Sequence, residues 1–109
     1  MVSLAEIESL ATQIVKECDP ERIILFGSYA HGTQHPDSDV DLLVVLSHGG
    51  RNWRKAAEIR SRVRSRFPVD LLVRAPWEVS RRIAEGDPFL REIVQRGRIL
   101  HARNHERMD

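Results

Sequence analysis

The chain has 109 residues, a length that predicts one domain. Its 17 Lys or Arg nearly balance its 16 Asp or Glu, so the net charge gives no argument for binding nucleic acid or a membrane. Its only cysteine, Cys18, excludes an intrachain disulfide and favours a reducing compartment. The N-terminus lacks the basic and apolar parts of a secretory signal and no apolar run is long enough to span a bilayer, so we expect a cytoplasmic protein.

Hydrophobic spacing and turn residues predict short strands that alternate with helices. In chain order we expect a helix over 4–18, a strand over 22–26, a loop over 27–38 with a helical turn at 29–31, a strand over 40–46, a loop over 47–50, a helix over 53–67, a strand over 69–73, helices from 76 to about 86 and from 88 to 97, and a strand over 98–101. This order is typical of an α/β domain in which helices cover a sheet. The domain should span residues 1–101, with a polar tail over 102–109.

Specific residues mark where the predicted helices begin and end. Ser3 and Glu6 form a capping-box pattern at the start of the first helix. Asp87 precedes Pro88, which is the pattern of an N-cap followed by proline at the first helical position. Gly97 is expected to end that helix.

Three acidic residues lie at or inside apolar strand patterns, namely Asp39, Asp41 and Asp70. A buried carboxylate is costly unless it is paired or holds a metal. Asp39 and Asp41 are two residues apart, so both point to one face of their strand, about 6.5–7 Å apart. If the strand of Asp70 is its neighbour, the three carboxylates converge on one patch that suits Mg²⁺ or Mn²⁺. The simpler alternative is a set of unrelated strand-end and capping aspartates.

Gly27 and Ser28 directly follow the first strand and open the possible helical turn. Glycine allows a phosphate to approach the backbone closely, and N–H groups and a hydroxyl can then donate to it. An ordinary turn is the alternative interpretation. A phosphate site beside a metal patch is the combination that triphosphate binding requires.

Gly27-Ser28 followed after ten residues by Asp39-Val40-Asp41 resembles the hallmark of the DNA polymerase β-like nucleotidyltransferase superfamily. The wider stretches 26–32 and 38–44 are similar to the minimal nucleotidyltransferase family, and the resemblance extends to the strand that contains Asp70. It implies a nucleotidyltransferase core with a short mixed sheet flanked by helices and no separate substrate domain.

The resemblance also implies roles for these residues. Asp39 and Asp41 would hold Mg²⁺, or Mn²⁺, together with the triphosphate of ATP. Asp70 would complete one metal site and help to activate the acceptor hydroxyl. Gly27 and Ser28 would hold the β- and γ-phosphates. His31 stands where related sequences often carry Arg or Lys, so its contact with phosphate is an open question.

Members of this family are commonly antitoxins whose partner toxin is a HEPN-domain ribonuclease. The resemblance therefore implies transfer of AMP to a tyrosine of a HEPN toxin. Two alternatives stay open: a non-catalytic antitoxin that masks its partner by binding, and a stand-alone transferase acting on a small molecule such as an aminoglycoside.

Other notable side chains have ordinary structural interpretations. Solvated loop positions are expected for His31, His35 and His48, whose spacing matches no familiar zinc pattern. Core packing, rather than base stacking, is expected for Trp53, Phe67 and Trp77. The arginine-rich stretch 51–66 is interpreted as a solvated face with a Glu58–Arg62 pair, and the alternatives are contact with an acidic partner, RNA or the triphosphate.

Overall fold

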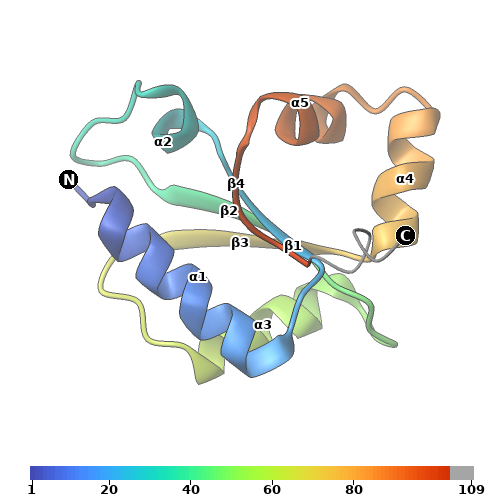
Figure 1. Cartoon of the computed structure of the whole chain (residues 1–109), viewed down its shortest axis with the longest axis horizontal. Helices are drawn as coiled ribbons and strands as arrows, with labels where there is room; N and C mark the ends of the chain where they lie inside the picture. Colours follow the sequence, from blue (N-terminus) through green and yellow to red (C-terminus); the bar gives the residue numbers. More distant parts are fainter. Residues whose placement is uncertain (104–109) are drawn as a thin grey trace.

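A four-stranded mixed sheet forms the middle layer of the computed structural model, which describes residues 1–103 (Figure 1). The strand order is β3-β2-β1-β4. β1 pairs antiparallel with β2 and β4, whereas β2 and β3 are parallel. The strands are β1 (Arg22–Phe26), β2 (Val40–Val45), β3 (Val69–Arg74) and β4 (Arg98–Ala102). The sheet is therefore short and mixed, as predicted.

Helices lie on both sides of this sheet. In Figure 1, α1 and α3 lie below the sheet, and α4 and α5 lie above it, with the short α2 at the left end. The helices are α1 (Leu4–Cys18), α2 (Ser28–His31), α3 (Asn52–Arg62), α4 (Pro76–Ala84) and α5 (Pro88–Arg96).

Alternate residues of the strands supply two separate apolar cores. Leu42 and Val44 of β2 pack with residues of α1 and α3 on one face. Leu43 and Val45 pack with residues of α4 and α5 on the other face. Because β2 is covered on both sides, it reads as a continuous apolar run apart from Asp41.

The predicted helix caps at Ser3 and Asp87 are confirmed. The Ser3 hydroxyl accepts the Glu6 N–H at 3.1 Å, and Glu6 accepts the Ser3 N–H at 3.0 Å. Asp87 accepts the N–H groups of Phe89 and Leu90. Gly97 ends α5, and a side chain there would overlap Ile24 and two backbone oxygens. Glycine is thus required where α5 turns closely over β1.

The third helix is shorter than predicted, because α3 ends at Arg62 rather than at Phe67. Val63 adopts an extended backbone. The side chain of Gln13 on α1 then accepts the Arg64 N–H at 2.9 Å and donates to the Arg64 carbonyl at 3.1 Å. These bonds replace those that another helical turn would have provided, and the apolar spacing up to Phe67 belongs to a packed loop.

The expected burial of two aromatic side chains is also wrong. Trp53 and Trp77 are 64% and 63% exposed, whereas Phe67 does pack partly buried against the core. Each tryptophan lies in the first turn of its helix, before the buried residues Ala56 of α3 and Val79 of α4. The helical spacing is correct, but the first turns do not lie over the sheet core.

The remaining differences concern the ends of elements. β2 ends one residue earlier than predicted, although Leu46 stays buried. β4 extends to Ala102, one residue into the expected polar tail, and residues 104–109 lie outside the described residues. Within the described part of the chain, no helix has both the length and the apolar character to cross a membrane.

Candidate active site

The three candidate aspartates lie at one end of the sheet, where β2 and β3 begin. Asp41 and Asp70 are direct partners in the parallel register. Asp39 lies immediately before β2, and its charge contributes to raising the pKa of Asp41. By strand alternation, Asp41 and Asp70 lie on the side from which Leu43 and Leu72 pack against α4 and α5. The topology therefore brings Asp41 and Asp70 together, with Asp39 beside them.

Gly27 lies against Asp41 from the neighbouring strand. It follows Phe26, which is the register partner of Asp41. Its φ of 76° and ψ of −156° belong to a region that is essentially restricted to glycine. A Cβ atom at this position would overlap the Asp41 Oδ2 atom and lie 3.2 Å from its Cγ. Gly27 therefore leaves room for the carboxylate, a function that the sequence argument had not assigned to it.

The negative charge of this patch is not compensated by a nearby cation. Burial, followed by the charges of Asp70 and Asp39, raises the pKa of Asp41. Within residues 1–103, no Lys, Arg or His nitrogen lies within 4.0 Å of any of the three carboxylates. The folded chain thus holds like charges close together, which favours binding of a cation.

The donor chemistry fits a hard divalent cation. In the part of the chain that the structure describes, no three Asp, Glu, His or Cys side chains are grouped so that they could hold a metal ion by themselves, so the three aspartates are not a preformed three-ligand site. Asp39 and Asp70 are exposed and Asp41 is half-buried, so their oxygens are open to solvent. Mg²⁺ binds through one or two carboxylates together with water and substrate phosphates rather than in a closed protein cage. An open pair of carboxylates with a third beside them matches this preference.

Ser28 and His31 lie at opposite ends of α2. Ser28 begins the helix directly after Gly27. The helix is anchored at its middle, where the Tyr29 hydroxyl accepts the Val2 N–H at 3.1 Å. His31 ends the helix, and its Nε2 lies 3.9 Å from a carboxylate oxygen of Glu92 on α5. The structure thus places Ser28 directly after Gly27, which lies against Asp41, and His31 towards α5.

An aromatic pair that sequence reasoning missed borders the aspartates. The rings of Phe26 and Phe89 meet edge to face with centroids 5.8 Å apart. Phe26 is adjacent to Asp41 across the sheet, and Phe89 is 53% exposed. The signal in the sequence was a large apolar residue in the first turn of α5, ahead of the inward-facing Leu90 and Ile93.

Comparisons with known proteins agree with this architecture. Residues 7–106 match the family model described as nucleotidyltransferase domain. A Sulfolobus solfataricus protein assigned as a nucleotidyltransferase has a TM-score of 0.57 at 22% identity, over 72% of this chain and 71% of that chain. The comparison with curated proteins found no match.

Two further solved structures come from toxin–antitoxin systems. A toxin–antitoxin structure with AMP-PNP has a TM-score of 0.56 at 26% identity, and a mutant of the toxin–antitoxin pair MntA–HpeT has a TM-score of 0.55 at 24% identity. Each comparison covers 91% of this chain and 76% of the other chain.

Proposed function

Because this chain belongs to the nucleotidyltransferase domain family, we propose that it transfers AMP from ATP to a hydroxyl group of a protein partner. The acceptor that we propose is a tyrosine of a HEPN-domain toxin, so that the chain acts as a cytoplasmic antitoxin. The observation that carries the proposal is the patch of Asp39, Asp41 and Asp70 beside Gly27. The likeness to a toxin–antitoxin structure with AMP-PNP supports both the nucleotide and the partner.

The patch supports a division of roles among its residues. Asp39 and Asp41, with Asp70, would hold Mg²⁺ or Mn²⁺, which supplies charge neutralisation for the triphosphate and the departing pyrophosphate. Gly27 keeps side-chain atoms away from Asp41. Its backbone and the Ser28 hydroxyl would meet the β- and γ-phosphates.

The proposed transfer is an in-line displacement at the α-phosphorus. The acceptor oxygen forms a bond to that phosphorus while the bond to the bridging oxygen of the β-phosphate breaks. The electron pair leaves with pyrophosphate, and the hydroxyl proton passes to the carboxylate of Asp70. Because the reaction needs little covalent chemistry from the protein, positioning and electrostatics supply most of the rate.

The open surface around the aspartates favours a large acceptor over a small one. Asp39 and Asp70 are exposed to solvent. A protein partner would supply the missing wall of an acceptor pocket.

The test is intact mass spectrometry of the chain and its co-encoded neighbour after incubation with Mg²⁺ and ATP. We expect a mass gain of one AMP on the neighbour, which mapping should locate on a tyrosine. Asp39→Asn and Asp41→Asn should abolish this gain. Asp37→Asn removes an exposed aspartate of the same loop and is the matched control.

Two results would contradict the proposal. If the Asp41→Asn chain still silences the neighbour although no AMP is transferred, the chain acts by masking its partner. If AMP appears instead on a small hydroxylated acceptor without any partner, the chain is a stand-alone transferase.

A further inference from the structure

Both tryptophans of the chain line one groove, which has a volume of about 510 Å³ and lies at the carboxyl ends of β2 and β3. We define this tryptophan groove by the residues Arg51, Trp53, Arg74, Trp77, Glu78 and Arg82. The aspartates lie where the same two strands begin, so the groove is at the opposite end of the sheet. Strands of six residues span about 20 Å. The groove is therefore separate from the candidate active site.

Both indole rings present apolar surface that residues 1–103 leave uncovered. Trp53 and Trp77 are about two-thirds exposed, although burying such rings is among the larger single gains available to a small fold. Arg54 covers one side of Trp53, with its guanidinium 5.4 Å from the ring centroid. Tryptophan and arginine are the residue types that dominate binding energy in protein interfaces. This composition indicates a docking surface.

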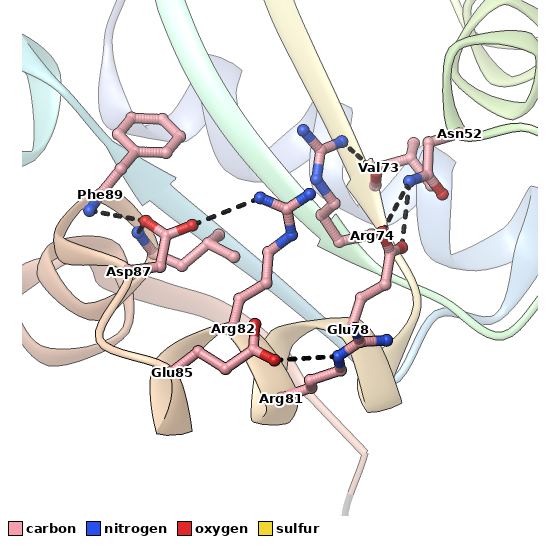
Figure 2. A network of polar contacts seen from close by, with 10 residues as sticks. Asn52, Val73, Arg74, Glu78, Arg81, Arg82, Glu85, Asp87 and Phe89 are labelled. Atoms are coloured by element: carbon pink, nitrogen blue, oxygen red, sulfur yellow. Dashed lines mark hydrogen bonds and ion pairs between the residues drawn. The ribbon is translucent and has the colours of Figure 1, made fainter.

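The floor of the groove is a fixed polar network that joins α3 to α4 (Figure 2). The Asn52 side-chain amide donates to both carboxylate oxygens of Glu78, at 3.0 and 3.3 Å. Glu78 also accepts the Ala75 N–H at 3.1 Å, and the His48 Nε2 atom lies 2.8 Å from the side-chain oxygen Oδ1 of Asn52. Because these groups are already ordered, little conformational freedom is lost when a partner docks.

The charge of the groove is positive and local. Among the described residues, no carboxylate lies within 4.0 Å of Arg51, Arg54 or Arg74. The Arg74 guanidinium donates to the Val73 carbonyl at 2.7 Å, whereas Arg82, which lines the same groove, is paired with Asp87 at 3.6 Å (Figure 2). Both oxygens of the one acidic side chain, Glu78, are occupied by the network.

Positive charge just outside the groove is paired with acids. Lys55 and Arg62 both contact Glu58, at 3.5 and 3.4 Å, and Arg81 contacts Glu85 at 3.2 Å. A single nucleic-acid strand is bound along a continuous basic track, which these pairs interrupt. A short acidic segment that places an apolar side chain between the two tryptophans fits this confined positive charge better than a nucleic-acid strand does.

We propose that the tryptophan groove docks an acidic, apolar-bearing segment of the partner protein. This inference rests on the proposed function only for the identity of that partner. Docking at this end would hold one segment of the partner, so that another part of the partner can bring the acceptor tyrosine to the aspartates at the other end.

The test is calorimetric binding of the co-encoded neighbour to the chain and to groove variants. Trp53→Ala combined with Trp77→Ala, and Arg51→Glu combined with Arg74→Glu, should each weaken binding by roughly tenfold or more. Ile99→Ala and Arg66→Glu change exposed residues elsewhere and should bind as the unchanged chain does. Circular dichroism checks that every variant is folded.

The outcomes separate this inference from the proposed function. If the neighbour gains AMP and both groove variants bind it normally, the docking inference is wrong and the transferase stands. If groove variants lose binding while no AMP is ever transferred, the docking inference stands alone. If a fluorescein-labelled oligouridylate binds the unchanged chain but not the tryptophan variant, the groove is a nucleic-acid site and the acidic-segment proposal is overturned.

Discussion

Gly27 allows the closest approach between backbone and carboxylate in the candidate site. Its conformation is essentially restricted to glycine, and an added Cβ would overlap Asp41. We expect Gly27→Ala to destabilise the fold by about 1–3 kcal/mol and to abolish AMP transfer even where the variant is folded. Urea unfolding and the mass assay measure the two effects.

Gly32→Ala provides a matched control for this substitution. Gly32 also has a positive φ, of 73°, but nothing lies within 4 Å of a Cβ placed there. Its variant should be destabilised and yet retain transfer. Equal loss of transfer in both variants would show that Gly27 matters only for folding.

Asp41 should reduce the stability of the chain in the absence of a cation. Its pKa is raised by burial and by the charges of Asp70 and Asp39, so its ionised form is disfavoured in the fold. We expect Asp41→Asn to raise the free energy of unfolding in EDTA by roughly 0.2–1 kcal/mol, the range for like charges opposed across strands. Melting curves with and without Mg²⁺ test this.

Mg²⁺ with ATP should raise the melting temperature of the unchanged chain and of Asp37→Asn, but not that of Asp41→Asn. The reason is linkage, because a ligand that binds only the folded state stabilises it. A variant that is both destabilised in EDTA and still stabilised by Mg²⁺ with ATP would refute the assignment of Asp41.

The aspartates could be predicted from the sequence because a carboxylate inside an apolar strand is a local anomaly. The two-residue spacing of Asp39 and Asp41 predicts that they share one side of the chain. Their distance from Asp70 could not be predicted, because it depends on the parallel register of β2 and β3. The exposure of Trp53 could not be predicted either, because helical spacing does not show where the sheet beneath a helix ends.

Local signals predicted the starts of α1 and α5 and the bounds of β1. Ser3 and Asp87 cap their helices as expected, and β1 has its predicted bounds. The predicted end of α3 was wrong because Gln13, whose side chain bonds to the loop after α3, lies 51 residues from Arg64 in the chain. No local pattern could reveal that contact.

The Gln13 contact should stabilise the loop after α3. We expect Gln13→Ala to lower the free energy of unfolding by about 1 kcal/mol, since two hydrogen bonds to the backbone of Arg64 are lost near the surface. Gln95→Ala on α5 removes an exposed glutamine and should have little effect. Urea denaturation compares the two variants, and equal stability would show that the loop does not need this anchor.

Glu78 links α3 and α4 in a manner that depends on pH. Burial acts to raise its pKa, but hydrogen bonds from Ala75 and Asn52 and the charge of Arg74 outweigh burial, so its pKa is lowered. The folded state therefore binds fewer protons than the unfolded state, and the stabilisation is present above the ordinary pKa of 4.5. It is lost as the pH falls through the lowered pKa.

Glu78→Gln should accordingly be less stable than the unchanged chain at neutral pH, and the difference should shrink in acid below the ordinary glutamate value. Thermal unfolding across this range measures the difference. Glu8→Gln, at an exposed position of α1, controls for the loss of one negative charge. A difference that grows in acid would have the wrong sign for this network.

The two proposed sites lie at opposite ends of the molecule. The aspartates lie where β2 and β3 begin, and the tryptophan groove lies where they end. The rigid sheet between them contains buried apolar residues, among them Leu42, Leu43 and Val44. Substitutions at the two ends should therefore act independently.

This independence predicts additive effects of distant substitutions. The Trp53→Ala and Trp77→Ala variant should lose affinity for the partner but keep the full stabilisation by Mg²⁺ with ATP. Asp41→Asn should show the reverse. Combined in one chain, the substitutions should reproduce both losses, each within about 0.5 kcal/mol of its separate value. Calorimetry with the partner and melting curves with ATP measure the two losses, and a larger deviation would mean that docking at one end alters nucleotide binding at the other.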